Sequence, residues 1–165
     1  MRKQFLLGLC TLPFLVTAQI NTASIEMSAK EVNDSVIAWR RHLHQNPELS
    51  NREFETMKYI VSKLQGLGLE IKSGVAKTGV VAILKGGKPG PVVALRADID
   101  ALPVIERVNL PFKSIATSEY GGQKVGVMHA CGHDTHTAML LGTATALSKM
   151  KKDIRGTVVF LFQPA

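Results

Sequence analysis

The stretch VMHACGHDTH, residues 127–136, places three histidines, one cysteine and one aspartate within ten residues. A short apolar run precedes it and a helix-like pattern follows it, so we expect a turn between a strand and a helix N-terminus. Thiolate and imidazole groups bind zinc and related divalent metals. If the turn is extended, Cys131 and His133 point to the same side, because side chains on extended backbone alternate. The pair therefore predicts part of a metal site, whose other ligands must come from elsewhere.

Three neighbouring polar residues bear on the plainer alternative, a buried free cysteine beside a hydrogen-bonded histidine. His129, Asp134 and His136 flank the pair in sequence and favour metal binding over that alternative. We expect all three to support the ligands rather than join them. His136 falls one turn into the helix, where we expect it to pack or to form a hydrogen bond.

The apolar pattern around this stretch predicts strands and helices in one layered domain. Residues 134–149 have helical spacing, and residues 157–162 form a continuous apolar run. Residues 80–84 and 92–95 are two more such runs, joined by a turn rich in glycine and proline. Strands that are apolar throughout are buried on both faces, so we predict an α/β fold with helices covering the sheet.

Two more helices are expected before the strands. Ser28 can cap the first, and Asn46-Pro47 ends it because the residue before proline avoids helical backbone. Residues 50–53 match a capping box for the second, which Gly66 stops.

Two other segments carry little chemical signal of their own. His42 and His44 lie beside arginines on the first helix, and we interpret them as surface or interface residues. Residues 104–123 show little periodicity, and we predict a long loop there.

A second candidate site is the acidic pair Asp98 and Asp100. The pair follows the apolar run 92–95, so both carboxylates fall at the carboxyl end of a predicted strand. Paired carboxylates can ligate a cation or orient a ligating histidine. The alternative is that one aspartate caps a turn while the other is solvated, and the spacing alone does not separate these.

The N-terminus has the composition of a secretory signal peptide. Arg2 and Lys3 precede an apolar segment over residues 5–16, and small residues follow it at positions 17 and 18. The segment is too short for a permanent membrane span. We therefore predict a signal peptide at residues 1–18, removed by signal peptidase, and a periplasmic or secreted protein.

The rest of the chain divides into a linker, residues 19–27, and one domain, residues 28–165. A formal charge of +7 is modest, and the basic residues near positions 149–155 fit a solvated helix end, so we expect no nucleic-acid partner. Cys10 lies in the signal peptide. Its removal leaves Cys131 without an internal disulfide partner, so that thiol is free, intermolecular or metal-bound.

Four motifs follow one another along the chain: WRRHLHQNPELS (39–50), RADIDALP (96–103), MHACGHD (128–134) and FQPA (162–165). Taken together, they resemble the family of aminoacylases, hippurate hydrolases and auxin-conjugate amidohydrolases among the metallopeptidases. The resemblance implies a three-layer α/β domain of the co-catalytic metalloexopeptidase type, truncated here, with the inserted dimerisation or lid domain absent. It also implies hydrolysis of the amide bond of N-acyl amino acids and a possible homodimer in the full-length form.

The resemblance also implies roles for single residues. Cys131 and His133 match family metal ligands, and Asp98 and Asp100 match the acidic motif near the metals, with Asp100 supporting the site. Relatives bind two divalent ions, for which zinc or manganese is expected here. In the family a glutamate pair, a general base and a metal ligand, follows the last motif directly. This chain ends at Ala165 without it, so we expect the 165-residue product to be inactive alone.

Two other functions stay open at the level of sequence. One is a truncated, non-catalytic paralogue that binds metal or a partner without turnover. The other is an exported thiol protein that uses Cys131 in redox chemistry, although the chain lacks a resolving cysteine at Cys-x-x-Cys spacing.

Overall fold

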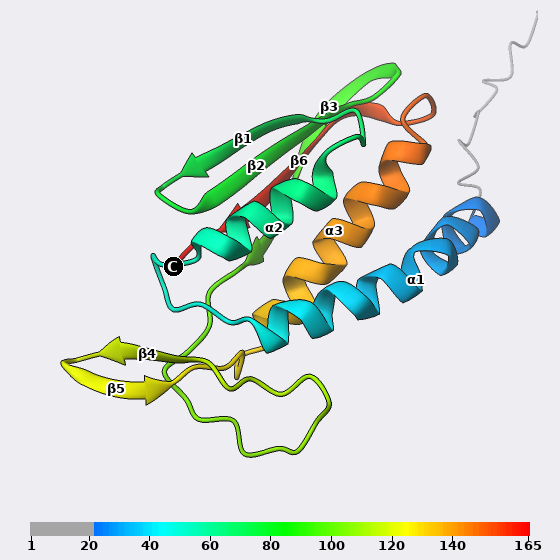
Figure 1. Ribbon diagram of the computed structural model, residues 1–165. Helices are drawn as coiled ribbons and strands as arrows, with labels where there is room; N and C mark the ends of the chain where they lie inside the picture. Colours follow the sequence, from blue (N-terminus) through cyan, green and yellow to red (C-terminus); the bar gives the residue numbers. More distant parts are fainter. Residues whose placement is uncertain (1–21) are drawn as a thin grey trace, which may run out of the picture.

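The apolar runs at residues 80–84 and 157–162 form the centre of a four-stranded mixed sheet in the computed structural model, which describes residues 22–165 (Figure 1). The strand order is β1-β2-β6-β3, with β6 antiparallel to β2 and parallel to β3. A separate two-stranded hairpin joins β4 and β5. The elements are α1 (Thr22–Gln45), α2 (Phe54–Leu64), β1 (Glu70–Val75), β2 (Gly79–Lys85), β3 (Lys88–Asp98), β4 (Thr117–Tyr120), β5 (Gln123–Gly126), α3 (His133–Lys149) and β6 (Arg155–Gln163).

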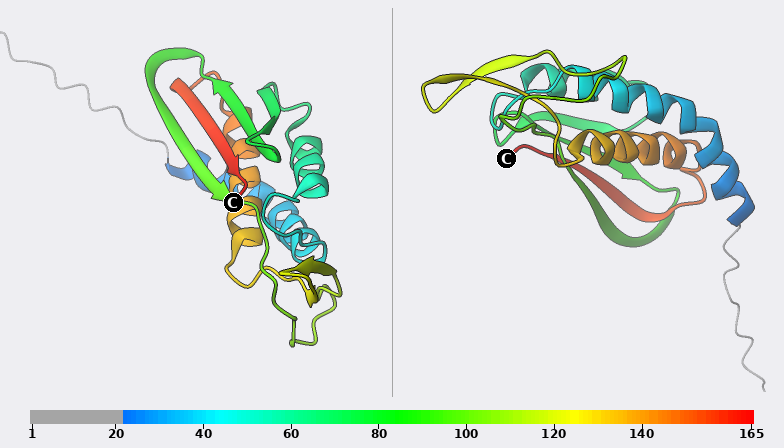
Figure 2. Two further views of the ribbon diagram at one scale, coloured as in Figure 1. Left: turned by 90° about the vertical axis from the view of Figure 1, so that its left-hand side faces the viewer. Right: turned by 90° about the horizontal axis from the view of Figure 1, so that it is seen from below.

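The helices lie on one side of the sheet (Figure 2). Helices α2 and α3 pack against the strands, and α1 packs along α3. Alternate residues of the central strands supply the core beneath them: Val80, Ala82 and Leu84 from β2, and Phe160 and Phe162 from β6. The α/β class is thus confirmed, and residues 22–165 form two of the three expected layers. No described helix is both long and apolar enough to cross a bilayer.

Strand β3 differs from the prediction that the apolar runs are buried on both faces. Val92 is 70% exposed and Val93 is 50% exposed. Both lie on an edge strand, and within residues 22–165 no helix covers the second face of the sheet. The prediction is therefore wrong for β3, because a continuous apolar run does not say which of its faces this part of the chain covers.

The start of α1 also differs from its prediction. The helix begins at Thr22, so Ser28 lies inside it rather than at its cap. Residues 22–27 of the expected linker are therefore helical. The predicted signal peptide, residues 1–18, and the first linker residues lie outside the described residues.

The capping box predicted for α2 does not form. The helix begins at Phe54, and the Ser50 hydroxyl donates its hydrogen bond to Asp100 instead of to the helix N-terminus. The Glu48 carboxylate accepts hydrogen bonds from the backbone N–H groups of Glu55, at 3.2 Å, and Thr56, at 2.7 Å. A carboxylate there satisfies N–H groups that the first turn leaves free and complements the helix dipole.

Other elements match their predictions to different degrees. Helix α3 and strands β2 and β6 are confirmed. The predicted loop over residues 104–123 is irregular at first, but it contains β4 and the start of the hairpin. Strand β1 was not predicted, because its residues alternate between polar and apolar only weakly.

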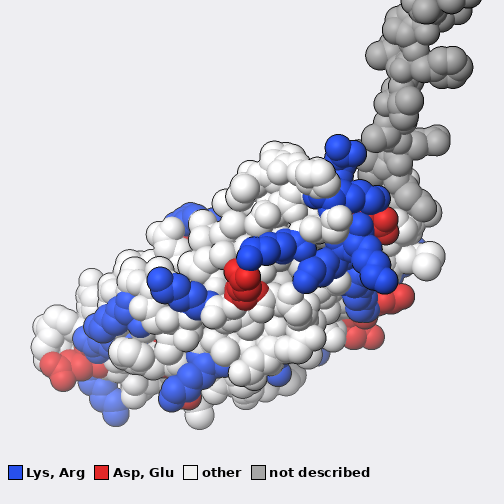
Figure 3. Space-filling model, turned by 90° about the horizontal axis from the view of Figure 1, so that it is seen from above, with Lys and Arg blue, Asp and Glu red and all other residues white. Residues whose placement is uncertain are grey.

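Basic side chains gather at one end of the molecule, where α3 ends and β6 begins (Figure 3). Several are paired there: Lys149 with Glu31 at 2.8 Å, and Lys88 with Asp153 at 3.2 Å. These exposed pairs fit a solvated surface, at the far end of α3 from the Cys/His stretch.

Candidate metal centre

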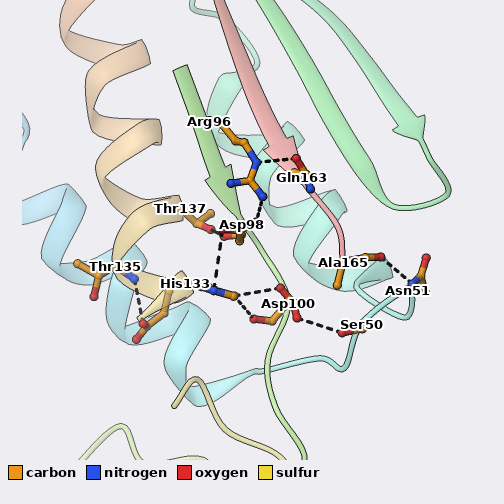
Figure 4. Close-up of polar contacts among 11 residues, drawn as sticks. Ser50, Asn51, Arg96, Asp98, Asp100, His133, Thr135, Thr137, Gln163 and Ala165 are labelled. Carbon is orange, nitrogen blue, oxygen red and sulfur yellow. Dashed lines mark hydrogen bonds and ion pairs between the residues drawn. The ribbon is translucent and has the colours of Figure 1, made fainter. Parts of the chain in front are cut away.

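The four motifs meet at one edge of the sheet, beyond the carboxyl ends of β3 and β6. These strands are parallel, so Asp98 and Gln163 lie side by side at their ends. Arg96 Nε donates to Gln163 Oε1 at 2.5 Å, and Asn51 Nδ2 donates to the Ala165 carbonyl at 2.7 Å (Figure 4). In open α/β sheets, ligands bind beyond the carboxyl ends of strands.

His133 lies between the two aspartates at this edge. Its Nδ1 is 2.9 Å from both the carbonyl oxygen and the Oδ1 atom of Asp100 (Figure 4). Both partners are acceptors, so Nδ1 carries a hydrogen, and in the neutral ring Nε2 is the nitrogen with the lone pair. Nε2 lies 4.0 Å from Oδ2 of Asp98. An imidazole fixed at one nitrogen by a carboxylate, with the other nitrogen free, has the arrangement of a metal ligand.

The two aspartates have different surroundings. Asp100 is buried, and its Oδ2 accepts a hydrogen bond from Ser50 Oγ at 3.0 Å. Asp98 is partly exposed, and its Oδ1 pairs with Arg96. Neither carboxylate is simply solvated, which removes the alternative that the spacing left open.

The turn that carries Cys131 and His133 is not extended. Gly132 between them has φ +85°, in the left-handed region, and is the N-cap of α3. The period-two argument for their common direction is therefore wrong. His133 is instead the first residue of α3. Cys131 lies in the turn before Gly132, and its side chain is exposed.

The described residues do not form a complete metal site. Among residues 22–165, no three His, Cys, Asp or Glu side chains converge as the ligands of one ion would. The donors present nevertheless suit a divalent ion, since an exposed thiol and an imidazole with a free Nε2 stand one residue apart.

The remaining histidines of the stretch lie on either side of the turn. His136 is exposed, with its ring 5.9 Å from that of His133. His129 is buried, and neither ring nitrogen has a hydrogen-bond partner among the described residues. Burial lowers the pKa of His129 to about 4, with the nearby His44 and His133 rings adding to the effect against the opposing charges of Asp134 and Asp100.

A buried polar network beside the turn was missed by the sequence interpretation. His42 is exposed as expected, but His44 is only 4% exposed and was wrongly placed at the surface. His44 Nδ1 lies 2.8 Å from Asp134 Oδ2, and its Nε2 lies 3.1 Å from Glu106 Oε1. The pattern of α1 contained one signal, because His44 follows the buried Leu43 directly.

The mixed sheet, with helices on one face and polar residues beyond its strand ends, is an α/β domain of the kind found in metallopeptidases. Residues 94–165 match the model of peptidase family M20/M25/M40. The resemblance found from the four motifs is thereby confirmed.

Curated relatives carry names of related activities. The chain is 50% identical over 141 residues to N-acyl-L-amino acid amidohydrolase of Geobacillus stearothermophilus, covering 86% of this chain and 36% of the relative. It is 45% identical over 150 residues to IAA-amino acid hydrolase ILR1-like 2 of Arabidopsis thaliana, covering 90% of this chain and 32% of the relative. The chain thus spans about a third of the length of the relatives that it matches.

Solved structures show the same fold. The YxeP protein of Bacillus subtilis, described as a dinuclear metal binding peptidase from the M20 family, has 45% identity and a TM-score of 0.71. The match covers 88% of this chain and 36% of that structure. An aminobenzoyl-glutamate utilization protein from Klebsiella pneumoniae has 25% identity and a TM-score of 0.64, over 86% of this chain and 39% of that structure.

Proposed function

We propose that this chain is part of a metal-dependent hydrolase that cleaves the amide bond of N-acyl amino acids. The observation that carries the proposal is the position of His133, held by Asp100 at Nδ1 with Nε2 free at the sheet edge. The exposed Cys131 thiol is the second donor beside it. The names of the relatives support the substrate class, since each amidohydrolase acts on an acyl group joined to an amino acid.

In this proposal some residues of the site bind metal and others hold the metal-binding side chains in place. Cys131 and His133 would hold divalent metal, either zinc or manganese, with two ions in the complete site. When bound, such ions polarise the scissile carbonyl and acidify water. Asp100 fixes the His133 ring through Nδ1, and Ser50 in turn fixes Asp100. Asp98 lies near Nε2 and adds negative charge on the side where a cation would sit.

The 165-residue chain alone is proposed to bind metal weakly and to turn over no substrate. Two donors on one turn do not complete a catalytic site, which takes three protein ligands. The competing proposal is a non-catalytic paralogue that binds metal or a partner. Reading the coding DNA beyond the Ala165 codon separates the two, because an in-frame Glu-Glu favours the hydrolase and a genuine stop favours the paralogue.

Metal analysis of the purified chain tests the ligand assignment. In equilibrium dialysis against Zn²⁺ or Mn²⁺, Cys131→Ala and His133→Ala are expected to bind less metal than the wild type at the same free-ion concentration. His42→Ala, an exposed histidine on α1, is the matched control and should bind as the wild type does. Unchanged metal content in Cys131→Ala would remove the assignment. Full amidase activity of a longer product after stringent chelation would remove the proposed mechanism.

We also propose that the protein is exported and that its longer form is a homodimer. The N-terminal sequence supports processing by signal peptidase and release into the periplasm or the medium, and an intact Met1 in cell extracts would exclude it. The mass of the longer form in solution tests the homodimer, because a mass of one chain would contradict it.

A further inference from the structure

The buried network around His44 links two distant parts of the chain to the turn that carries Cys131 and His133. His44 lies in the last turn of α1, while Asp134 follows His133 directly. Both side chains are buried, and Asp134 is only 1% exposed. Burying charged groups is costly unless they are paired and hydrogen-bonded, so these contacts constrain the segments that carry them.

Every oxygen of the Asp134 carboxylate is engaged. Oδ2 forms an ion pair with Arg40 Nε at 2.8 Å and lies 2.8 Å from His44 Nδ1. Oδ1 accepts from the backbone N–H of Thr135 at 2.9 Å, in the first turn of α3. The carboxylate therefore joins the end of α1 to the start of α3, one residue from a predicted metal ligand.

The other side of His44 holds the loop that follows β3. Glu106 Oε1 lies 3.1 Å from His44 Nε2, and Glu106 Oε2 accepts from the Ser114 backbone N–H. Ser114 Oγ donates to the Val127 carbonyl at 2.6 Å. Val127 begins the stretch, residues 127–136, that contains Cys131 and His133. His44 is therefore connected to both ends of the turn: directly to Asp134, after it, and through Glu106 and Ser114 to Val127, before it.

We propose that His44 is a positioning residue of the metal centre. With Arg40 and Glu106 it holds Asp134 and Val127, and thereby fixes the turn in the geometry in which Cys131 and His133 bind metal together. This inference rests on the proposed function, because it concerns the same two ligands. His44 itself does not touch the metal.

Cobalt binding tests the proposal, because a thiolate-to-cobalt charge-transfer band in the near ultraviolet reports the Cys131 bond directly. His44→Gln is expected to raise the Kd for Co²⁺ at least about tenfold and to weaken the band, as loss of partners behind metal ligands does. Arg40→Gln is a milder variant on the same carboxylate, because Arg40 is one-third exposed. It is expected to shift Kd in the same direction.

A matched control separates positioning from general loss of stability. Thr78 donates to Glu53 at 2.6 Å, and both residues are fully buried away from the turn. Thr78→Val should therefore lower the stability of the fold and leave the Kd for Co²⁺ unchanged. The inference is overturned if Thr78→Val weakens cobalt binding as much as His44→Gln, or if folded His44→Gln and Arg40→Gln bind as tightly as the wild type.

Hydrogen exchange of the metal-free chain distinguishes this inference from the proposed function. Absence of the thiolate band in the wild type would remove the proposed ligands. Even then, His44→Gln should speed exchange of the Thr135 amide at least about tenfold, while the amides of β2 and β6 keep their protection. Unchanged exchange at Thr135 would overturn the positioning role.

Discussion

Asp100 determines which nitrogen His133 offers to a ligand, since it accepts from Nδ1 with two oxygens. Asp100→Ala removes the carboxylate, so the ring can turn and lose its preferred tautomer. We expect the affinity for Zn²⁺ or Co²⁺ to fall about ten- to a hundredfold. Competition against a chromophoric chelator measures it. Asp100→Asn, which keeps an acceptor, should lose less, and Asp153→Ala, an exposed aspartate, should lose nothing.

His129 predicts a pH-dependent stability of the metal-free chain. Its pKa is about 4 in the fold, lowered mainly by burial, against an ordinary value of 6.5. As pH falls below 6.5, the unfolded chain binds a proton that the folded chain refuses until about pH 4. The free energy of unfolding should therefore fall by up to about 3 kcal/mol across this window and level off below it.

Urea denaturation at pH 7, 5.5 and 4 checks this slope. His129→Leu removes the titrating ring and should flatten the curve between pH 6.5 and 4. Some loss below that window is expected to remain, because burial raises the pKa of Glu106 but hydrogen bonds from His44 and Ser114 lower it further, below its usual value. An equal slope in wild type and His129→Leu would contradict the assignment.

The contact between α1 and α3 depends on a glycine. A Cβ on Gly142 would meet the Val36 Cγ2 methyl well inside van der Waals contact. Valine is stiff at χ1 and cannot turn away cheaply. Although alanine is the better helix former by about 1 kcal/mol, we expect Gly142→Ala to lower stability by about 1–3 kcal/mol through overpacking. Thermal unfolding measures the change.

Thr143→Ala is the matched substitution on the same helix. Thr143 is more open and returns its hydroxyl to the Met139 carbonyl within α3. Its loss should change stability by no more than about 0.5 kcal/mol. A stabilised Gly142→Ala would mean that the two helices can separate at no cost.

Elements set by local pattern were predictable from the sequence, and pairings between distant segments were not. Helix α3 and strand β6 follow from their own periodicity and spacing. The roles of Ser50 and His44 do not, because Asp100 lies 50 residues from Ser50 and Asp134 lies 90 residues from His44. Ser50 stood in a sequence that fits a helix cap equally well, and only the packed fold shows that it holds Asp100 instead.

In the sheet, too, the strands themselves were predictable from local sequence, whereas their order was not. The apolar runs correctly predicted strands, but β6 lies between β2 and β3 although it comes last in the chain. One face of this sheet meets the helices. The other is uncovered within residues 22–165, where partly exposed Ile83 and Leu161 follow on from Val92. Apolar surface of this kind favours association.

The uncovered face and the β3 edge predict that the 165-residue chain self-associates at micromolar concentrations. An edge strand with exposed apolar residues offers free backbone groups to another chain. Val92→Lys places a charge there and should lower the average mass in sedimentation, with stability changed by no more than about 0.5 kcal/mol. Ile115→Lys is the control, since Ile115 is 84% exposed in the loop before β4. If both variants reduce association equally, the contact does not run through the sheet.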